Sequence, residues 1–242
     1  MKEYLTKEEI AQNEDYFISL LGHIHRDGAK VDELIQKLRA SDFFVAPATT
    51  QYYGSYLGGL CEHSIEVFGN LVALVEEKML VDEKGQHYEL QPEDELFESI
   101  IIIGLLHDIC KMNRFEETTK NVKKYVQGGK NKDDKGSYNW ESESFFQARS
   151  LNNRFIYGSD GETSEYMVRQ FIPLTLEESV AIINSKGDTD NNQTRGSNLG
   201  AIFSKYNLPL LLHCADLMAC YIDDPTNKPH ISKARVNEQE TY

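Results

Sequence analysis

Four residues of metal-binding type interrupt apolar segments that are otherwise typical of buried helices. His63 lies in GGLCEHSIEVF, His107 and Asp108 close IIIIGLLHDICK, and Asp216 lies in LPLLLHCADLMACYI. Imidazole and carboxylate ligands that leave one position open for water allow a metal ion to generate hydroxide near neutral pH and to absorb negative charge. Hydrolysis of a phosphate ester needs both, so these residues predict a metal centre for that reaction.

Each of these residues also has a purely structural interpretation. A single histidine on an apolar helix, as at His63, is more often a satisfied core residue than a ligand. Asp216 needs a pairing group or a metal, because an isolated buried carboxylate is very costly. A helix cap or a salt bridge stays open for it, although no lysine or arginine lies between residues 205 and 228. His107 and Asp108 point about 100° apart on a helix and converge on one ion only at a helix end or a distortion.

Helical periodicity, with apolar residues at three- and four-residue intervals, recurs along the chain. The segments that show it are 7–21, 31–40, about 60–79, about 94–110, 162–172 and 208–222. Pro173 ends the fifth of them, and Thr175 with Glu178 has the form of a capping box that opens another helix. Residues 119–148 differ, because aromatic and alternating residues around a Gly/Asn/Asp-rich centre indicate an inserted β-hairpin or flap. We therefore expect an all-α helical bundle with one insertion.

Composition and charge restrict the class of protein. The chain has 242 residues, of which 40% are hydrophobic, and a formal net charge of −14. The size suits one folded domain, and the negative charge argues against non-specific binding of duplex DNA, which depends on cationic contacts. The longest apolar run, residues 100–106, is far shorter than the roughly 20 residues of a membrane span. With no secretory signal and no CxxC pair among the cysteines, we expect a cytoplasmic protein without a membrane partner.

The order and spacing of the candidate ligands resemble the HD-domain superfamily of metal-dependent phosphohydrolases. The pattern is GGLCEHS, then GLLHDICK with its histidine 44 residues after the first one, then the aspartate of LLHCADLMA. Bacterial members with a hairpin after the His-Asp helix and a FIPLT-like segment are the most similar. The resemblance implies one HD-like helical domain over 1–242. Its parts would be N-terminal helices at 1–44, an HD core at 45–222, the inserted hairpin at 119–148 and a polar tail at 223–242.

The resemblance also implies a role for each matched residue. One divalent ion (Mn, Ni, Co, Fe, Zn or Mg) would be held by four ligands, which are His63, His107, Asp108 and Asp216. Asp108 would also take part in catalysis. So would Lys111, which matches the lysine that commonly follows the His-Asp pair and would lie near the phosphate. His213, one turn before Asp216, could orient that carboxylate.

The chain departs from binuclear members of the superfamily. Asp160 and Ser185 stand where those members have two further histidines, and no histidine occurs between residues 107 and 213. We therefore expect one metal ion rather than two, with Asp160 as a further candidate ligand. Gln51 and Tyr53 replace the arginine and histidine that relatives tend to have before the first ligand, so substrate recognition is not implied by the resemblance.

The segment that follows the proposed ligands is basic. Residues 111–135 contain eight basic and four acidic residues. They could fold over the site, where Lys111, Arg114 and Lys124 would bind phosphate oxygens, or they could form a solvated flap.

Together these features predict a metal-dependent phosphohydrolase, either a phosphomonoesterase or a phosphodiesterase. Its substrate would be a small phosphorylated molecule such as a nucleotide, or a phosphoester of a nucleic acid. The alternative is a catalytically degenerate HD module that binds a metal and a nucleotide or protein partner without turnover. Either form could be an oligomer.

Overall fold

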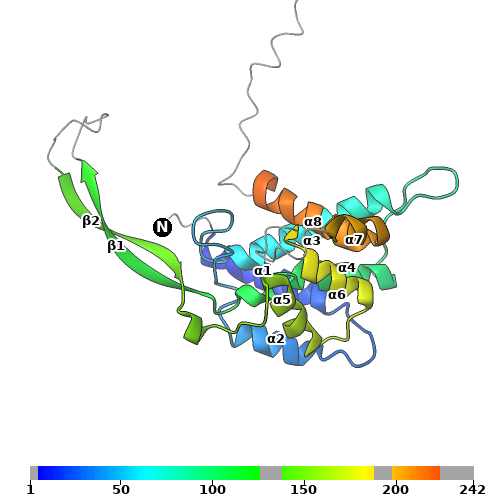
Figure 1. The fold of residues 1–242 in the computed structure, drawn as a ribbon, viewed down its shortest axis with the longest axis horizontal. Helices are drawn as coiled ribbons and strands as arrows, with labels where there is room; N and C mark the ends of the chain where they lie inside the picture. Colours follow the sequence, from blue (N-terminus) through cyan, green and yellow to red (C-terminus); the bar gives the residue numbers. More distant parts are fainter. Residues whose placement is uncertain (1–4, 126–137, 188–197, 224–242) are drawn as a thin grey trace, which may run out of the picture.

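The computed structural model describes residues 5–125, 138–187 and 198–223. Within these ranges the helices pack into one body, and a two-stranded antiparallel sheet projects from its side (Figure 1). The helices are α1 (Lys7–Leu21), α2 (Val31–Arg39), α3 (Gly59–Lys78), α4 (Glu95–Leu106), α5 (Asp160–Arg169), α6 (Leu176–Asn184), α7 (Leu199–Lys205) and α8 (Asn207–Met218). The strands are β1 (Phe115–Tyr125) and β2 (Tyr138–Ala148). The predicted polar tail after Asp223 and the basic residues Lys130, Lys132 and Lys135 lie outside the described residues.

The prediction of an all-α fold is wrong. β1 and β2 contain eleven residues each and pair from Phe115 opposite Ala148 to Tyr125 opposite Tyr138. The fold is therefore a mixture of helices and a sheet. The sheet also begins four residues before the expected insertion at residue 119. The β-branched and aromatic residues along both strands favour extended backbone, and cross-strand pairs stabilise it over the whole length.

The core forms where α4 passes between its neighbours. α3 packs against α4 and α8, and α6 packs against α8 and α5. All seven residues from Ile100 to Leu106 are buried, which is why the sequence is apolar on every side of this helix. At Gly104 a Cβ atom would lie 3.0 Å from the Cα atom of Phe68 in α3. This glycine thus permits the close approach of the two helices that carry His63 and His107.

The sequence predicts the start of α6 and places the ends of α5 and α8 to within a few residues. Thr175 and Glu178 form the expected capping box at the start of α6, and α5 ends at Arg169, three residues before Ile172, the expected last residue. The predicted helix at 208–222 is α8 followed by a π-helical turn, Ala219–Asp223. Among the described residues, no helix combines the length and apolar character needed to cross a membrane.

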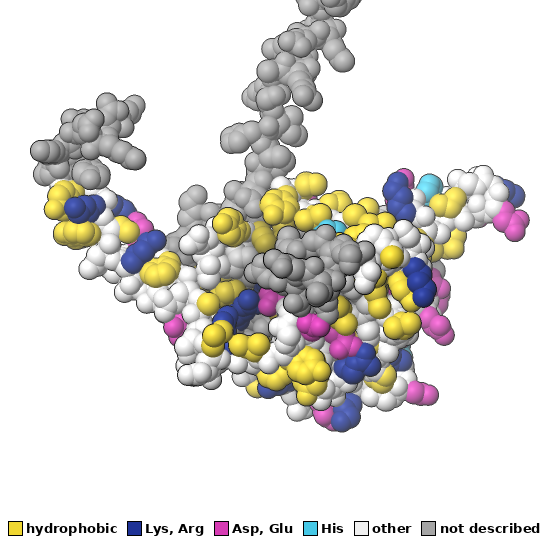
Figure 2. Space-filling model, viewed as in Figure 1, with side chains coloured by type: hydrophobic (Ala, Val, Ile, Leu, Met, Phe, Trp, Pro, Cys, Tyr) yellow, Lys and Arg dark blue, Asp and Glu magenta, His cyan; other side chains and the backbone are white. Residues whose placement is uncertain are grey.

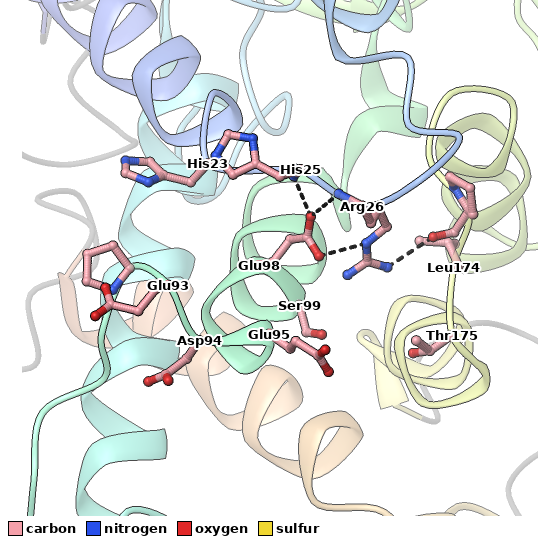
Figure 3. A pocket seen from close by; sticks show the side chains of 12 residues that line it. His23, His25, Arg26, Glu93, Asp94, Glu95, Glu98, Ser99, Leu174 and Thr175 are labelled. Atoms are coloured by element: carbon pink, nitrogen blue, oxygen red, sulfur yellow. Dashed lines mark hydrogen bonds and ion pairs between the residues drawn. The ribbon is translucent and has the colours of Figure 1, made fainter.

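A buried ion-pair network joins the loop after α1 to α4 and α6. Arg26 donates to Glu98 of α4 at 3.0 Å and to Glu178 of α6 at 2.7 Å, and Ser99 donates to Glu178 at 2.7 Å. The Arg26–Glu98 contacts lie beside a cavity of about 560 Å³ (Figure 3). None of the predicted metal ligands lines this cavity. The arginine and both carboxylates are fully engaged with each other, so we assign them a structural role.

Replacing Arg26 with methionine should destabilise the protein by about 3 kcal/mol, because Glu178, whose side chain is 0% exposed, would lose its buried partner. Burial raises the pKa of this carboxyl, but Arg26, Ser99 and the Thr175 amide hold the pKa below its usual value. Stability from a carboxyl with a depressed pKa is present above its unfolded pKa and is lost as pH falls through the folded pKa. In urea unfolding, the free energy of unfolding of Arg26→Met should therefore be lower than that of wild type at pH 7, and this difference should become smaller as the pH falls. Lys30→Met, which removes an exposed pair, is the control, and equal stability of both variants would contradict the assignment.

Candidate metal centre

The four predicted ligands converge at one buried point. His63 comes from α3, His107 and Asp108 from the end of α4, and Asp216 from α8. Nε2 of His63 lies 3.6 Å from Asp108 Oδ2 and 3.1 Å from Asp216 Oδ1. Nε2 of His107 lies 3.6 Å and 3.7 Å from the same two oxygens. The side chains of the four residues are at most 5% exposed.

The end of α4 explains how adjacent residues reach the same point. His107 is the C-cap of α4, Asp108 leaves helical geometry with φ −110° and ψ 16°, and a 3-10 turn follows at Ile109–Lys111. On a continuous helix the two side chains would diverge by about 100°. The α-helix ends between Leu106 and Asp108, and this break lets the two side chains point to the same place.

The donor set fits a divalent metal ion. Nδ1 of His107 lies 2.9 Å from the carbonyl oxygen of Gly104, so this nitrogen donates and Nε2 keeps a free lone pair. Among the described residues, Nε2 of both histidines and Oδ1 of Asp108 are buried without a hydrogen-bond partner. Ligands about 2.1 Å from one ion in a tetrahedral arrangement lie about 3.4 Å from each other. The four imidazole–carboxylate separations, 3.1–3.7 Å, are close to that spacing.

Two buried lysines lie against the carboxylates. Nζ of Lys111 lies 2.7 Å from Asp108 Oδ2, and Nζ of Lys186 lies 3.1 Å from both Asp108 Oδ2 and Asp216 Oδ2. Burial raises the pKa of Asp108, but Lys111 and Lys186 outweigh it and hold the pKa well below its usual value. Lys186 is likewise the main cause of the lowered pKa of Asp216. Both carboxylates are therefore ionised and able to bind a cation.

No family model, curated protein or solved structure matches this chain. The resemblance to the HD-domain superfamily therefore rests on the sequence pattern, and membership in that superfamily is carried forward as a proposal.

Lys186 contacts both predicted carboxylate ligands, and sequence reasoning did not select it. The salt bridge left open for Asp216 has its partner here, at the end of α6 and 30 residues away along the chain. Two signals could have found it. Lys186 directly follows Ser185, which stands in place of a histidine, and it is the single basic residue between Arg169 and Arg195.

Cys220 and Tyr53 also contact the predicted ligands. Sγ of Cys220 lies 3.6 Å from Asp216 Oδ1, and Cys220 groups with His63 and Asp216 as a possible ligand set. Burial raises the pKa of its thiol, so it lies in the site as a neutral group, a weaker ligand than a thiolate. The centres of the Tyr53 and His63 rings lie 4.8 Å apart, and the Tyr53 hydroxyl accepts a hydrogen bond from Lys111 Nζ at 3.0 Å.

Asp160 and His213 have other partners than the predicted metal site. Asp160 pairs with Arg114 at 2.6 Å and does not belong to either ligand group found among the described residues. His213 Nδ1 lies 2.7 Å from the Ser185 carbonyl oxygen, and no hydrogen bond joins His213 to Asp216 in the described part of the chain. The structure therefore gives His213 Nδ1 a partner in the turn after α6, and an orienting role of His213 toward Asp216 stays a prediction.

Lys124 lies away from the centre. It is exposed on the projecting hairpin and pairs with Glu141 at 2.7 Å and Glu143 at 3.4 Å. Figure 2 shows basic and hydrophobic side chains together on this hairpin, where Lys123 lies over the rings of Tyr138 and Trp140. Replacing Lys124 with alanine should change metal content by less than about twofold, because its exposed ammonium pairs with Glu141 and Glu143 and such surface pairs contribute little to stability. A larger loss of bound metal would contradict this placement.

A pocket of about 320 Å³ is lined by the two lysines that contact Asp108, and none of the four predicted ligands lines it. Tyr53, Lys111, Arg114, Asp160 and Lys186 all line it, together with Thr49 and Phe115. A second pocket of about 240 Å³ shares Arg114 and Asp160 and is lined further by apolar side chains such as Phe155 and Ile156. The arrangement can receive an anionic group at the lysines, with room beside it for a less polar part of the same molecule.

Proposed function

We propose that this chain is an HD-type, metal-dependent phosphohydrolase that acts with one divalent ion on a nucleotide or on a phosphoester of a nucleic acid. The observation that carries the proposal is that the Nε2 atoms of two buried imidazoles lie 3.1–3.7 Å from oxygens of two buried carboxylates, next to a lysine-lined pocket. His63, His107, Asp108 and Asp216 would hold the ion. A divalent ion in such a site supplies Lewis acidity and lowers the pKa of water.

The surrounding side chains account for the remaining requirements of ester hydrolysis. The buried ammonium of Lys111 would bind a phosphate oxygen and offset the charge that develops there as water adds to phosphorus and the ester P–O bond breaks. Oδ1 of Asp108, which has no hydrogen-bond partner among the described residues, would accept the proton of the attacking water. The pocket shared by Arg114 and Asp160 would hold the leaving group.

A degenerate module that binds without turnover is the second candidate. It is favoured by one observation: the ammonium groups of Lys111 and Lys186 already balance the two buried carboxylates.

Metal analysis followed by an activity panel separates the two candidates. Purified protein would be assayed with Mn²⁺, Ni²⁺ or Co²⁺ against nucleoside monophosphates, p-nitrophenyl phosphate and bis-p-nitrophenyl phosphate. We expect bound metal and metal-dependent release of product from at least one compound. Bound metal without turnover of any of them would favour the degenerate module.

A further inference from the structure

We propose that Lys186 is a tethered second cation of the metal centre: it takes the place of a second metal ion and directs the loaded centre toward the dianionic phosphate of a monoester. The inference rests on the proposed function, because it requires a divalent ion at the imidazole side of the two carboxylates.

The two carboxylates lie between a pair of imidazoles and a pair of ammonium groups. Asp108 Oδ2 is 3.6 Å from Nε2 of each histidine, yet it also accepts from Lys111 at 2.7 Å and from Lys186 at 3.1 Å. Asp216 Oδ1 lies 3.1 Å from His63 Nε2 and 3.3 Å from Lys186 Nζ, and Asp216 Oδ2 lies 3.1 Å from Lys186 Nζ. In two-metal hydrolases a pair of ions about 3.5–4 Å apart clamps the reacting phosphate. Here the two imidazoles provide donors for one ion, and the Lys186 ammonium binds oxygens of both carboxylates as a second cation would.

The backbone holds the Lys186 ammonium at this place. The Ser185 carbonyl accepts from His213 Nδ1 at 2.7 Å. Gly187 has φ +58°, and a Cβ atom there would lie 2.8 Å from His213 Cε1. Ser185 is thus hydrogen-bonded to α8, the helix that carries Asp216, and Gly187 packs closely against the same helix.

Lys186 also reaches the substrate pocket. Its side chain keeps 15% of its surface exposed, and it lines the 320 Å³ pocket together with Lys111 and Tyr53. A lysine that served only to neutralise buried carboxylates would not need to reach this wall. Its ammonium can therefore contact a phosphate oxygen while it stays bonded to Asp108 and Asp216.

The charge of the loaded centre selects the class of ester. One divalent ion, two carboxylates and two ammonium groups leave a net charge of +2. A phosphate monoester carries about −1.5 to −2 at pH 7 and neutralises this charge, whereas a diester carries a single negative charge. A second divalent ion on the lysine side would meet the Lys186 ammonium, so the centre should hold one ion only.

Titration calorimetry with simple probes tests the inference. Mn²⁺ would be titrated into metal-free protein, and inorganic phosphate, methyl phosphate and dimethyl phosphate into Mn²⁺-loaded protein. We expect one Mn²⁺ per chain and at least about tenfold weaker binding of dimethyl phosphate than of methyl phosphate. Two Mn²⁺ per chain, or equal affinity for the two esters, would overturn the proposal.

Variants separate the proposed role from a structural one. Lys186→Met should bind Mn²⁺ more tightly, since a nearby positive charge is removed, and inorganic phosphate at least about tenfold more weakly. Lys205→Met, which removes an exposed lysine of α7, should behave as wild type, and Lys186→Arg should retain phosphate affinity. Unchanged phosphate affinity in Lys186→Met, or loss of Mn²⁺ and phosphate together in a folded variant, would overturn the proposal.

Three further outcomes complete the test. If that variant fails to fold, loss of phosphate binding in folded Lys186→Arg would overturn the proposal, and one Mn²⁺ with preserved phosphate binding would support it. One Mn²⁺ and Lys186-dependent phosphate binding without hydrolysis of any ester would support the tethered cation while refuting the phosphohydrolase. Failure of wild type to bind Mn²⁺ would overturn both.

Discussion

Replacing Asp216 with asparagine is expected to lower metal affinity by at least about 100-fold and to abolish metal-dependent hydrolysis. Loss of groups that merely support metal ligands already costs about 10–100-fold in affinity or activity, and this change removes the charge of a ligand itself. Asparagine has nearly the volume of aspartate, so the packing around the buried side chain is preserved. Metal content by mass spectrometry and Mn²⁺ titration would measure the effect.

Asp160→Asn is the matched control for that experiment. Asp160 is a carboxylate that lines the 320 Å³ pocket, but it pairs with Arg114 at 2.6 Å and belongs to neither possible ligand group of the described residues. We expect this variant to keep its metal. Full metal content in Asp216→Asn, or equal losses in the two variants, would show that the ligand assignment is wrong.

Replacing Lys111 with methionine is expected to lower kcat by about 10²–10³-fold, the usual effect of removing one group that stabilises transition-state charge. The stoichiometry of bound metal should stay at one, because Lys111 is not a ligand and Lys186 still neutralises part of the charge of Asp108. The larger effect should fall on kcat rather than on KM, since the charge on the phosphate oxygens grows as the P–O bond breaks. Steady-state kinetics with metal analysis on the same samples would measure both quantities.

Lys120→Met provides the comparison for Lys111. Lys120 is exposed on β1, where its ammonium lies 5.0 Å from the centre of the Phe145 ring, and its replacement should leave kcat within about twofold of wild type. An unchanged kcat in Lys111→Met would exclude its proposed role. Loss of metal together with activity would instead show that Lys111 serves only to hold Asp108.

The elements and the candidate ligands were predictable from the sequence because their signals are local. The spacing of apolar residues over a few turns predicts a helix, and the capping box at Thr175 depends on residues three positions apart. The anomaly of Asp216 is equally local, since a carboxylate in an apolar helix requires a partner wherever that helix lies. The class of the fold was misjudged for the opposite reason: the length of β1 and β2 depends on pairing between segments that are separated in the sequence.

Partners of the charged residues were decided by tertiary structure alone. The sequence by itself determined that Asp216 must be paired or metal-bound, and that the helix after Leu106 must break for His107 and Asp108 to meet. It did not determine that Lys186 would reach Asp216, that Asp160 would pair with Arg114, or that Lys124 would remain on an exposed hairpin. Such contacts form only when packing brings distant segments within a few ångströms, and the strength of a charge interaction depends on that distance and on burial. The predicted His-Asp centre thus acquired from the fold a buried lysine that its sequence pattern did not contain.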